Sequence, residues 1–247
     1  MSLKIFIGSS ANGEDSPIES IYEYTLRKNS TQDLDITWMR QTNDSSSYWS
    51  NWKTEKWYTP FSGFRWGIAE ACNFKGKALY TDTDMINLKD ISELFLTNMK
   101  NKPFAARIAK RFNGFQPCVM LIDCYRAKGV LKSKADIASD ADSHNIYMKQ
   151  LIKKKRFFWK NAYFAELDKR WNCLDGEDLE ISEMYQLHFT KMSTQPWKPS
   201  WYKGNTEEHQ RKDILDLYYS LLEEASENGF KPDPQNKDNV IYNIIGK

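Results

Sequence analysis

The sequence predicts an α/β fold, in which helices flank a doubly wound, mixed and mostly parallel sheet. Short apolar segments alternate with helical patterns over the first 90 residues, which is typical of parallel strands joined by crossover helices. The length of 247 residues suits one domain with a sizeable core. Small residues follow the first strand pattern and acidic residues follow the third. Because ligands bind beyond the carboxyl ends of strands in such sheets, both segments are expected at one functional edge.

The first half of the chain contains three strand patterns separated by helical ones. Pro17 suits the first turn of a helix, with Asp15 or Ser16 as the capping residue. Ser62 is expected to cap a second helix, which runs to about Asn73. The expected elements are, in order, a strand at 3–7, a helix from 17, a strand at 34–39, a helix at 62–73 and a strand at 77–81.

The second half is expected to complete the same domain. Further strands are predicted at 104–108, 118–122 and 186–189, and helices at 144–154, 161–168 and 207–227. Residues 1–204 are expected to form the functional domain, and residues 205–247 a C-terminal helix and extension packed on it. The polar, proline-containing tail from Gly229 is expected to be loosely held.

The composition argues against a membrane-spanning or nucleic-acid-binding protein. No run approaches the roughly 18 apolar residues that a bilayer span needs, and no signal-peptide pattern precedes the first strand. A net charge of +2 gives no general attraction to nucleic acid, and the short basic run at 153–156 predicts at most peripheral membrane contact. Four cysteines without a CxxC pair, namely Cys72, Cys118, Cys124 and Cys173, are interpreted as reduced core residues of a cytoplasmic protein.

Asp82-Thr83-Asp84 is the strongest candidate for a metal site. The sequence has three Asp-x-Asp triplets, but only this one ends an apolar strand and precedes further apolar residues, Met85 and Ile86. Two crowded carboxylates repel each other unless a cation neutralises them. Their oxygens suit Mg²⁺ or Mn²⁺, which keep positions open for substrate phosphates. A helix-capping acidic turn is the alternative, and the pattern alone leaves both interpretations open.

The surrounding residues resemble glycosyltransferase family 8 and its relatives of GT-A fold. In that family an aromatic, arginine-bearing helix precedes the strand that ends in Asp-x-Asp. The segment at 117–123, Pro-Cys-Val-Met-Leu-Ile-Asp, is similar to the family's G-V-M-L-I-N strand, and the similarity extends over roughly residues 3 to 200. The segments that carry the resemblance are Phe61–Trp66, Asn73–Met85, Asp90–Phe95, Pro117–Asp123, Arg170–Asn172 and Leu187–Thr190.

The resemblance implies a Rossmann-like GT-A domain and a metal-dependent, retaining glycosyltransferase. The expected donor is a UDP- or GDP-sugar, and the expected acceptor is a glycan, glycolipid or protein, as in polysaccharide biosynthesis. The metal, Mn²⁺ or Mg²⁺, would be held by Asp82, Asp84 and His188. A neutral imidazole is a competent ligand for Mn²⁺. Taken without the resemblance, His188 would be interpreted as a hydrogen-bonded histidine of the core.

The resemblance also implies a set of donor contacts. Arg65 would lie near the donor sugar and phosphate, where a guanidinium suits a diphosphate, unless it is a surface arginine. The family's motif H-x-x-G-x-x-K-P-W is not intact after His188, so either Lys191 or Lys198 would reach the diphosphate. The remaining expected donor contacts are Gly8 and Ser9, which a plain tight turn would also explain, and Thr83 between the two aspartates.

Six aromatic residues leave two roles open. They would either form a lid over the sugars or pack in the core. They are Tyr48, Trp49, Trp52, Trp57, Trp197 and Trp201.

Two other functions are alternatives to sugar transfer. They are a Mg²⁺-dependent phosphoryl-transfer enzyme and a non-catalytic carbohydrate- or nucleotide-binding protein. Phosphoryl transfer of the haloacid-dehalogenase type needs its aspartates after the first strand, whereas here they follow the third.

Overall fold

A six-stranded sheet forms the centre of the protein. The computed structural model describes residues 2–11, 13–109, 114–153, 162–198 and 202–231. The strand order is β2-β1-β3-β6-β5-β7. The strands are β1 (Leu3–Gly8), β2 (Leu34–Met39), β3 (Lys77–Asp82), β5 (Phe104–Ala109), β6 (Gly114–Asp123) and β7 (Phe164–Glu166).

The sheet is mixed and mostly parallel, as the sequence predicts. Strand β1 pairs in parallel with β2 and β3, and β5 pairs in parallel with β7. Strand β6 pairs antiparallel with both of its neighbours, β3 and β5, so it runs opposite to the other described strands. This arrangement brings the carboxyl ends of β1 and β3 to one edge, where Gly8 is opposite Asp82.

A second, three-stranded sheet lies at that edge. Its order is β4-β9-β8, formed by β4 (Met85–Asn87), β9 (Gln186–His188) and β8 (Cys173–Leu174). The chain passes from β3 to β4 through the turn that contains Asp84. Strand β9 runs antiparallel to β4, with His188 opposite Met85. The small sheet therefore places a residue from late in the sequence beside the Asp-x-Asp turn.

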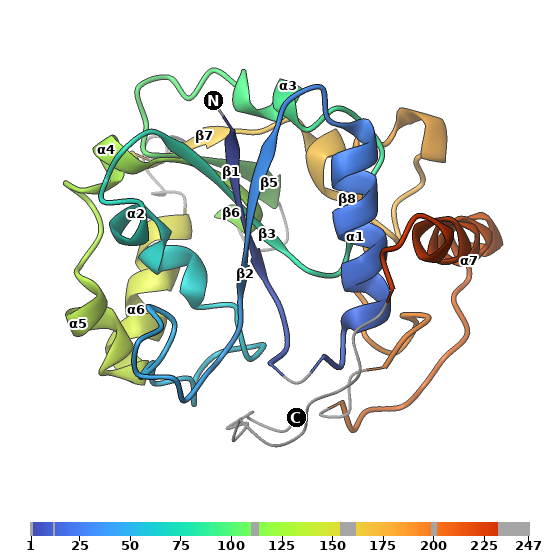
Figure 1. The fold of residues 1–247 in the computed structure, drawn as a ribbon. Coiled ribbons are helices and arrows are strands. Elements are labelled where there is room, and N and C mark those ends of the chain that lie inside the picture. Colours follow the sequence, from blue (N-terminus) through green and yellow to red (C-terminus); the bar gives the residue numbers. More distant parts are fainter. Residues whose placement is uncertain (1, 12, 110–113, 154–161, 199–201, 232–247) are drawn as a thin grey trace.

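Helices cover both faces of the central sheet (Figure 1). Helix α1 and the C-terminal α7 lie on one side, and α2, α4, α5 and α6 lie on the other. The α-helices are α1 (Ser16–Asn29), α2 (Ile68–Ala71), α3 (Ser92–Phe95), α4 (Cys124–Ala127), α5 (Lys134–Ala138), α6 (Ala141–Ile152) and α7 (Lys212–Glu227). Short 3₁₀ segments are η1 (Phe64–Gly67), η3 (Lys169–Asn172) and η4 (Ile181–Glu183).

Alternation along β1 divides the core between the two faces. Ile5 and Ile7 pack with Tyr22 and Leu26 of α1, whereas Phe6 belongs to the opposite cluster. Neighbouring residues of a strand point to opposite faces, so one strand supplies both cores. The aromatic residues follow the core alternative, since those of the described chain are buried or packed against buried neighbours. They are Trp49, Trp52, Trp57 and Trp197, which are buried, and Tyr48, which is partly buried; Trp201 lies outside the described residues.

Two predicted helices are wrong in type or extent. The helix expected at 161–168 is instead the strand β7, which pairs with β5 along its three residues. The helix expected at 62–73 is divided into η1 and α2. The boundary between the two falls at Gly67, where an added Cβ would lie 3.0 Å from the Trp52 ring. Asn73 and Phe74, with φ of 51° and 55°, then end the segment.

The other predicted elements agree with the structure to within a few residues, with one exception. The helix predicted at 207–227 begins five residues later than expected, at Lys212. Helix α6 begins after Asp140, whose side chain accepts hydrogen bonds from the backbone N–H groups of Asp142 and Ser143. All four cysteines are free thiols, and Cys118 is the least buried of them. Within the described ranges, no helix combines the length and apolar character that crossing a membrane requires.

Candidate active site

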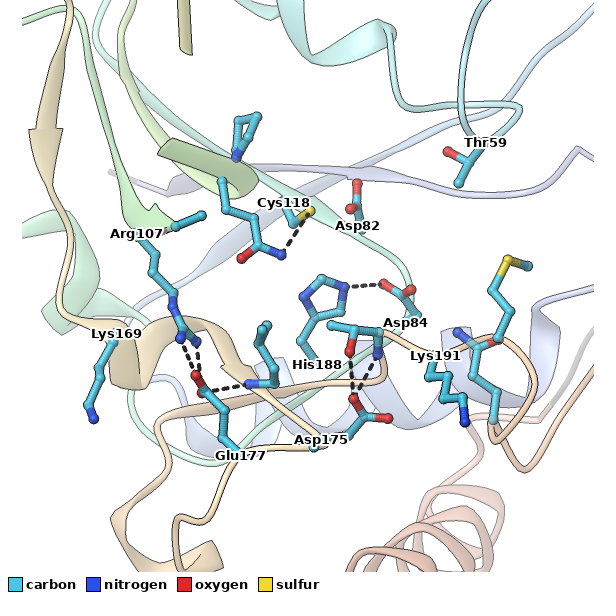
Figure 2. A pocket seen from close by; sticks show the side chains of 18 of the residues that line it. Thr59, Asp82, Asp84, Arg107, Cys118, Lys169, Asp175, Glu177, His188 and Lys191 are labelled. Carbon is cyan, nitrogen blue, oxygen red and sulfur yellow. Dashed lines mark hydrogen bonds and ion pairs between the residues drawn. The ribbon is translucent and has the colours of Figure 1, made fainter. Parts of the chain in front are cut away.

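The turn Asp82-Thr83-Asp84 opens onto a large cavity at the carboxyl edge of the sheet. The cavity has a volume of about 2340 Å³. Figure 2 shows Asp82 and Cys118 on one side of its centre and Asp84 and His188 on the other. Strand β3 supplies Asp82, β6 supplies Cys118 and β9 supplies His188, so three strands converge on this place. The prediction that the Asp-x-Asp turn lies at a ligand-binding edge agrees with this geometry.

Asp82 is held in place by two donors. Its side-chain oxygen Oδ1 accepts a hydrogen bond from the hydroxyl of Tyr80 and lies 3.0 Å from Nη2 of Arg65. Asp82 is 8% exposed and Arg65 is 5% exposed, so the ion pair lies in the protein interior. Both donors bind Oδ1, and the other carboxylate oxygen is left for the cavity.

Arg65 does not reach into the cavity as the sequence analysis expects. Its Nε donates to the backbone oxygen of Ser62 at 2.6 Å, and Nη1 donates to the backbone oxygen of Pro117. Its guanidinium carbon also lies 4.3 Å from the centre of the Tyr80 ring. Burial alone would lower the pKa of Arg65, but its anionic surroundings raise it. In this geometry Arg65 orients Asp82, and its contact with a diphosphate stays a prediction.

His188 is aimed at Asp84 by a second polar side chain. Its Nδ1 lies 2.8 Å from Oδ1 of Asn172, and its Nε2 lies 3.3 Å from Oδ1 of Asp84. With the amide oxygen of Asn172 facing the ring, Nδ1 is the atom that donates this hydrogen bond. In the neutral ring, the Nε2 lone pair then faces a carboxylate oxygen. Two electron-rich atoms at this distance require a proton or a cation between them, which is the geometry of a metal-binding histidine and its orienting partner.

The electrostatics of this pair fit a cation. Burial and then the nearby Asp82 raise the pKa of Asp84, while His188 counteracts them. Burial lowers the pKa of His188, but the attraction of Asp84 outweighs it and the pKa is raised overall. Among the described residues, Oδ1 of Asp84 accepts no hydrogen bond. The donor set therefore fits the divalent cation that the sequence analysis expects.

Cys118 also faces this group. The ligand atoms of Asp82, Cys118 and His188 all lie within 4.8 Å of one another. Gln116 on the same strand directs its amide nitrogen toward the Cys118 sulfur, at 3.9 Å. Burial and then the charge of Asp82 raise the pKa of the Cys118 thiol well above its usual range. The sequence pattern predicts only a core cysteine at this position, whereas the structure places Cys118 in the cavity lining.

The expected nucleoside and donor contacts lie at different depths. Gly8 sits at the end of β1, where an added Cβ would lie 2.8 Å from the Phe61 ring. Ser9 is fully buried, and its hydroxyl donates to Glu19. Thr83 lines the cavity, and its hydroxyl has no hydrogen-bond partner among the described residues. Of these three residues, Thr83 is the one that lines the cavity, although it is 1% exposed.

The two candidate lysines also differ in how exposed they are. Lys191 lines the cavity and is exposed, with its ammonium paired to Glu207. Lys198 is half-buried, and its ammonium donates to the backbone oxygen of Gln195. Burial lowers the pKa of Lys198. A surface ion pair exchanges readily for a phosphate, so Lys191 is the better placed of the two.

Further polar residues of the cavity were not predicted from the sequence. Arg107 on β5 forms an ion pair with Glu177, with Nη1 2.8 Å from Oε2, on the far side of the cavity from Lys191 (Figure 2). Asp15 lines the cavity as well, and it accepts a hydrogen bond from Nε1 of Trp197 at 3.0 Å. Burial raises the pKa of Asp15 to about 7. Their distance from the Asp-x-Asp turn along the chain left no local signal to find them.

Comparison with solved structures identifies the fold as that of GT-A glycosyltransferases. The chain is similar to the galactosyltransferase LgtC in complex with donor and acceptor sugar analogues, with a TM-score of 0.57 and 10% identity over 90% of this chain and 96% of that one. It is also similar to the glycosyltransferase GlyE of Streptococcus pneumoniae TIGR4, with a TM-score of 0.55 and 13% identity over 96% of this chain and 66% of that one.

A third similar structure is the bifunctional glycosyltransferase WbbM, with a TM-score of 0.56 and 11% identity. The match covers 92% of this chain but 51% of WbbM, so this chain spans about half of that protein's length. No protein-family model matches the sequence, and no curated protein matches it either. At such low identities, the similarity establishes the fold, and the function is argued from the site.

Proposed function

We propose that this protein is a metal-dependent glycosyltransferase that moves a sugar from a nucleoside diphosphate sugar to an acceptor. The observation that carries the proposal is that Asp82 and His188 approach each other on a large cavity at the carboxyl edge of the sheet, with Asp84 in contact with His188. A buried histidine in contact with one carboxylate and close to a second fits a divalent cation, Mn²⁺ or Mg²⁺.

Several side chains orient the groups that would bind the donor. Arg65 and Tyr80 fix one oxygen of Asp82, and Asn172 fixes the ring of His188. Asp82, Asp84 and His188 would hold the Mn²⁺ or Mg²⁺, which would supply a Lewis acid toward the negative charge of the departing diphosphate. Lys191, released from Glu207, is the side chain that we assign to the same diphosphate. By resemblance, the transfer retains the configuration at the anomeric carbon.

The size of the cavity suits two substrates. Sites for one small ligand usually measure about 300–1,000 Å³, and this cavity of about 2340 Å³ is larger. The Arg107–Glu177 pair and Gln116 line the side away from Lys191 and offer hydrogen bonds to sugar hydroxyls. We assign that side to the acceptor, a glycan, glycolipid or glycoprotein of the kind used in polysaccharide biosynthesis.

A donor screen tests the proposal directly. The purified protein is heated with each of several UDP- and GDP-sugars, with Mn²⁺ or with chelator. A ligand present at 100 times its dissociation constant stabilises by about 2.7 kcal/mol, which is readily detected as a rise in melting temperature. The expected result is stabilisation by one nucleotide class that depends on the metal. Absence of stabilisation by every nucleotide sugar in the presence of Mn²⁺ would count against the donor site.

Product analysis separates the proposal from its two rivals. Incubation of the stabilising donor with Mn²⁺ is expected to release nucleoside diphosphate, slowly to water and faster once an acceptor is present. Release of orthophosphate would instead identify a phosphoryl-transfer enzyme. Binding of the donor without any turnover would identify a non-catalytic binding protein.

A further inference from the structure

Cys118 lies in the metal site proposed above, although the metal-binding triad inferred from the sequence does not include it. Its sulfur, a ligand oxygen of Asp82 and a ring nitrogen of His188 lie within 4.8 Å of one another. Three atoms at most 4.8 Å apart share a point that lies within about 2.8 Å of each, whereas metal–ligand distances are about 2.0–2.3 Å. Inward movements of about half an ångström would therefore bring all three atoms to one cation.

The backbone fixes Cys118 in this position. Strands β3 and β6 pair antiparallel with Thr81 opposite Val119, so the next position places Cys118 beside Asp82. Arg65 links the two strands, because it donates hydrogen bonds to the side chain of Asp82 and to the backbone oxygen of Pro117. The family motif that this segment resembles has glycine at the position of Cys118. This chain therefore adds a sulfur at a place where the motif has no side chain.

The other cysteines show no such placement. Cys72 and Cys124 belong to the aromatic core cluster, and Cys173 directs its sulfur toward backbone oxygens of η3. None of these three lines the cavity as the structure describes it, whereas Cys118 does. Cys118 also packs against a core cluster, but it is the one of the four that faces the cavity within the described residues.

We propose that Cys118 is a ligand of the cation that Asp82 and His188 hold, and that it makes this site prefer thiophilic divalent cations. The proposal rests on the metal site of the proposed function and specifies its selectivity. Oxygen-only sites suit Mg²⁺, whereas a set of sulfur, nitrogen and oxygen suits Zn²⁺ or Co²⁺. The expected order of affinity is Zn²⁺ above Co²⁺, Co²⁺ above Mn²⁺, and Mn²⁺ far above Mg²⁺.

Cobalt spectroscopy tests the sulfur ligand without reference to activity. Co²⁺ is added to the metal-free full-length protein, and binding is followed by calorimetry and by absorption. A cobalt–thiolate bond produces a sulfur-to-metal charge-transfer band in the near ultraviolet, which oxygen and nitrogen ligands do not give. The wild-type protein is expected to show this band with one bound Co²⁺, and the Cys118→Ser and Cys118→Ala variants are expected to lack it.

A matched variant and a second metal complete the test. Cys173→Ser keeps a donor to the same backbone oxygens, so it should fold and retain the band. Loss of one ligand should weaken Zn²⁺ affinity at least about tenfold in Cys118→Ser, while Mn²⁺ affinity changes by less than about threefold. Far-ultraviolet circular dichroism confirms that both variants are folded.

The outcomes separate this proposal from the one on which it rests. Co²⁺ binding with the charge-transfer band, lost in both Cys118 variants and retained in Cys173→Ser, supports the sulfur ligand. Co²⁺ binding without the band, or with a band that survives Cys118→Ala, overturns it and leaves the Asp–His site intact. Failure of Co²⁺, Zn²⁺ and Mn²⁺ to bind at all overturns both proposals.

Discussion

Replacement of Arg65 by methionine is expected to destabilise the protein strongly, because it leaves a buried carboxylate without its cation. Arg65 is 5% exposed, and it pairs with Asp82 while also bonding the backbone oxygens of Ser62 and Pro117. Methionine fills a similar volume and offers no donor. Removal of one member of a buried ion pair costs about 3–5 kcal/mol. For a domain of this size, 1 kcal/mol corresponds to about 2–4 °C, so the melting temperature should fall by roughly 6–20 °C.

Thermal unfolding followed by circular dichroism, in chelator, measures this effect. Arg27→Met is the matched control, since Arg27 pairs with Glu23 on the surface of α1 with 42% of its side chain exposed. Surface pairs contribute about 0–1 kcal/mol, so this control should lower the melting temperature by less than about 4 °C. The double variant Arg65→Met/Asp82→Asn should recover part of the loss, because it removes the unpaired charge.

Two results would refute this reasoning. An Arg65→Met protein that melts within a degree or two of Arg27→Met would show that the buried pair does not stabilise the fold. A double variant less stable than Arg65→Met alone would show that the charge of Asp82 is not the source of the loss. In either case Arg65 would again be a candidate for direct contact with the donor.

Three further predictions concern other charges of the cavity. Asp84→Asn should melt at or above the wild-type temperature in chelator, because burial already disfavours the charged form, yet calorimetry should show loss of Mn²⁺ binding; retained affinity would remove Asp84 from the site. Mn²⁺ affinity should fall as pH decreases, beginning above pH 6.5, because the raised pKa of His188 lets protons compete with the metal; a constant affinity from pH 8 to 5.5 would exclude His188 as a ligand. Asp15 has a pKa of about 7 in the folded protein against 3.8 when unfolded, so folding favours its protonated form and stability should decline as pH rises from about 4 to about 7. Urea unfolding of the metal-free protein measures this decline, which Asp15→Asn should abolish. An unchanged decline in Asp15→Asn would contradict the assignment.

The main strands were predictable because each shows an apolar pattern within its own residues. Strand β2 agrees with its predicted bounds, and β3 differs by one residue. Strand β7 was mistaken for a helix because three residues are too few to show alternation. Pairing with β5, far away in sequence, makes these residues a strand, and packing of Phe164 on Phe104 holds them there.

The site was predictable to the extent that its residues follow strand ends. Asp82 and Asp84 follow β3 directly, so the strand pattern indicated their edge. His188 was predicted by resemblance to a known family, and its neighbours Leu187 and Phe189 are fully buried in a core cluster. The direction of Arg65 and the approach of Cys118 to Asp82 depend on the register between β3 and β6. Register is a property of two distant segments together, and neither segment encodes it alone.

The balance of charge in the site leads to a last prediction, that Mn²⁺ and nucleoside diphosphate bind with positive coupling. Arg65 neutralises Asp82, and above the raised pKa of His188 the neutral imidazole leaves the charge of Asp84 uncompensated, so without a metal the centre is anionic and repels a diphosphate. A divalent cation reverses the sign of this charge and offers open coordination positions to phosphate oxygens. Because linkage is reciprocal, each ligand must then strengthen the other, typically by 5–150-fold. Calorimetric titration of UDP and GDP with Mn²⁺ and with chelator measures the coupling. Equal diphosphate affinity under both conditions would mean that the cation and the diphosphate do not share this centre.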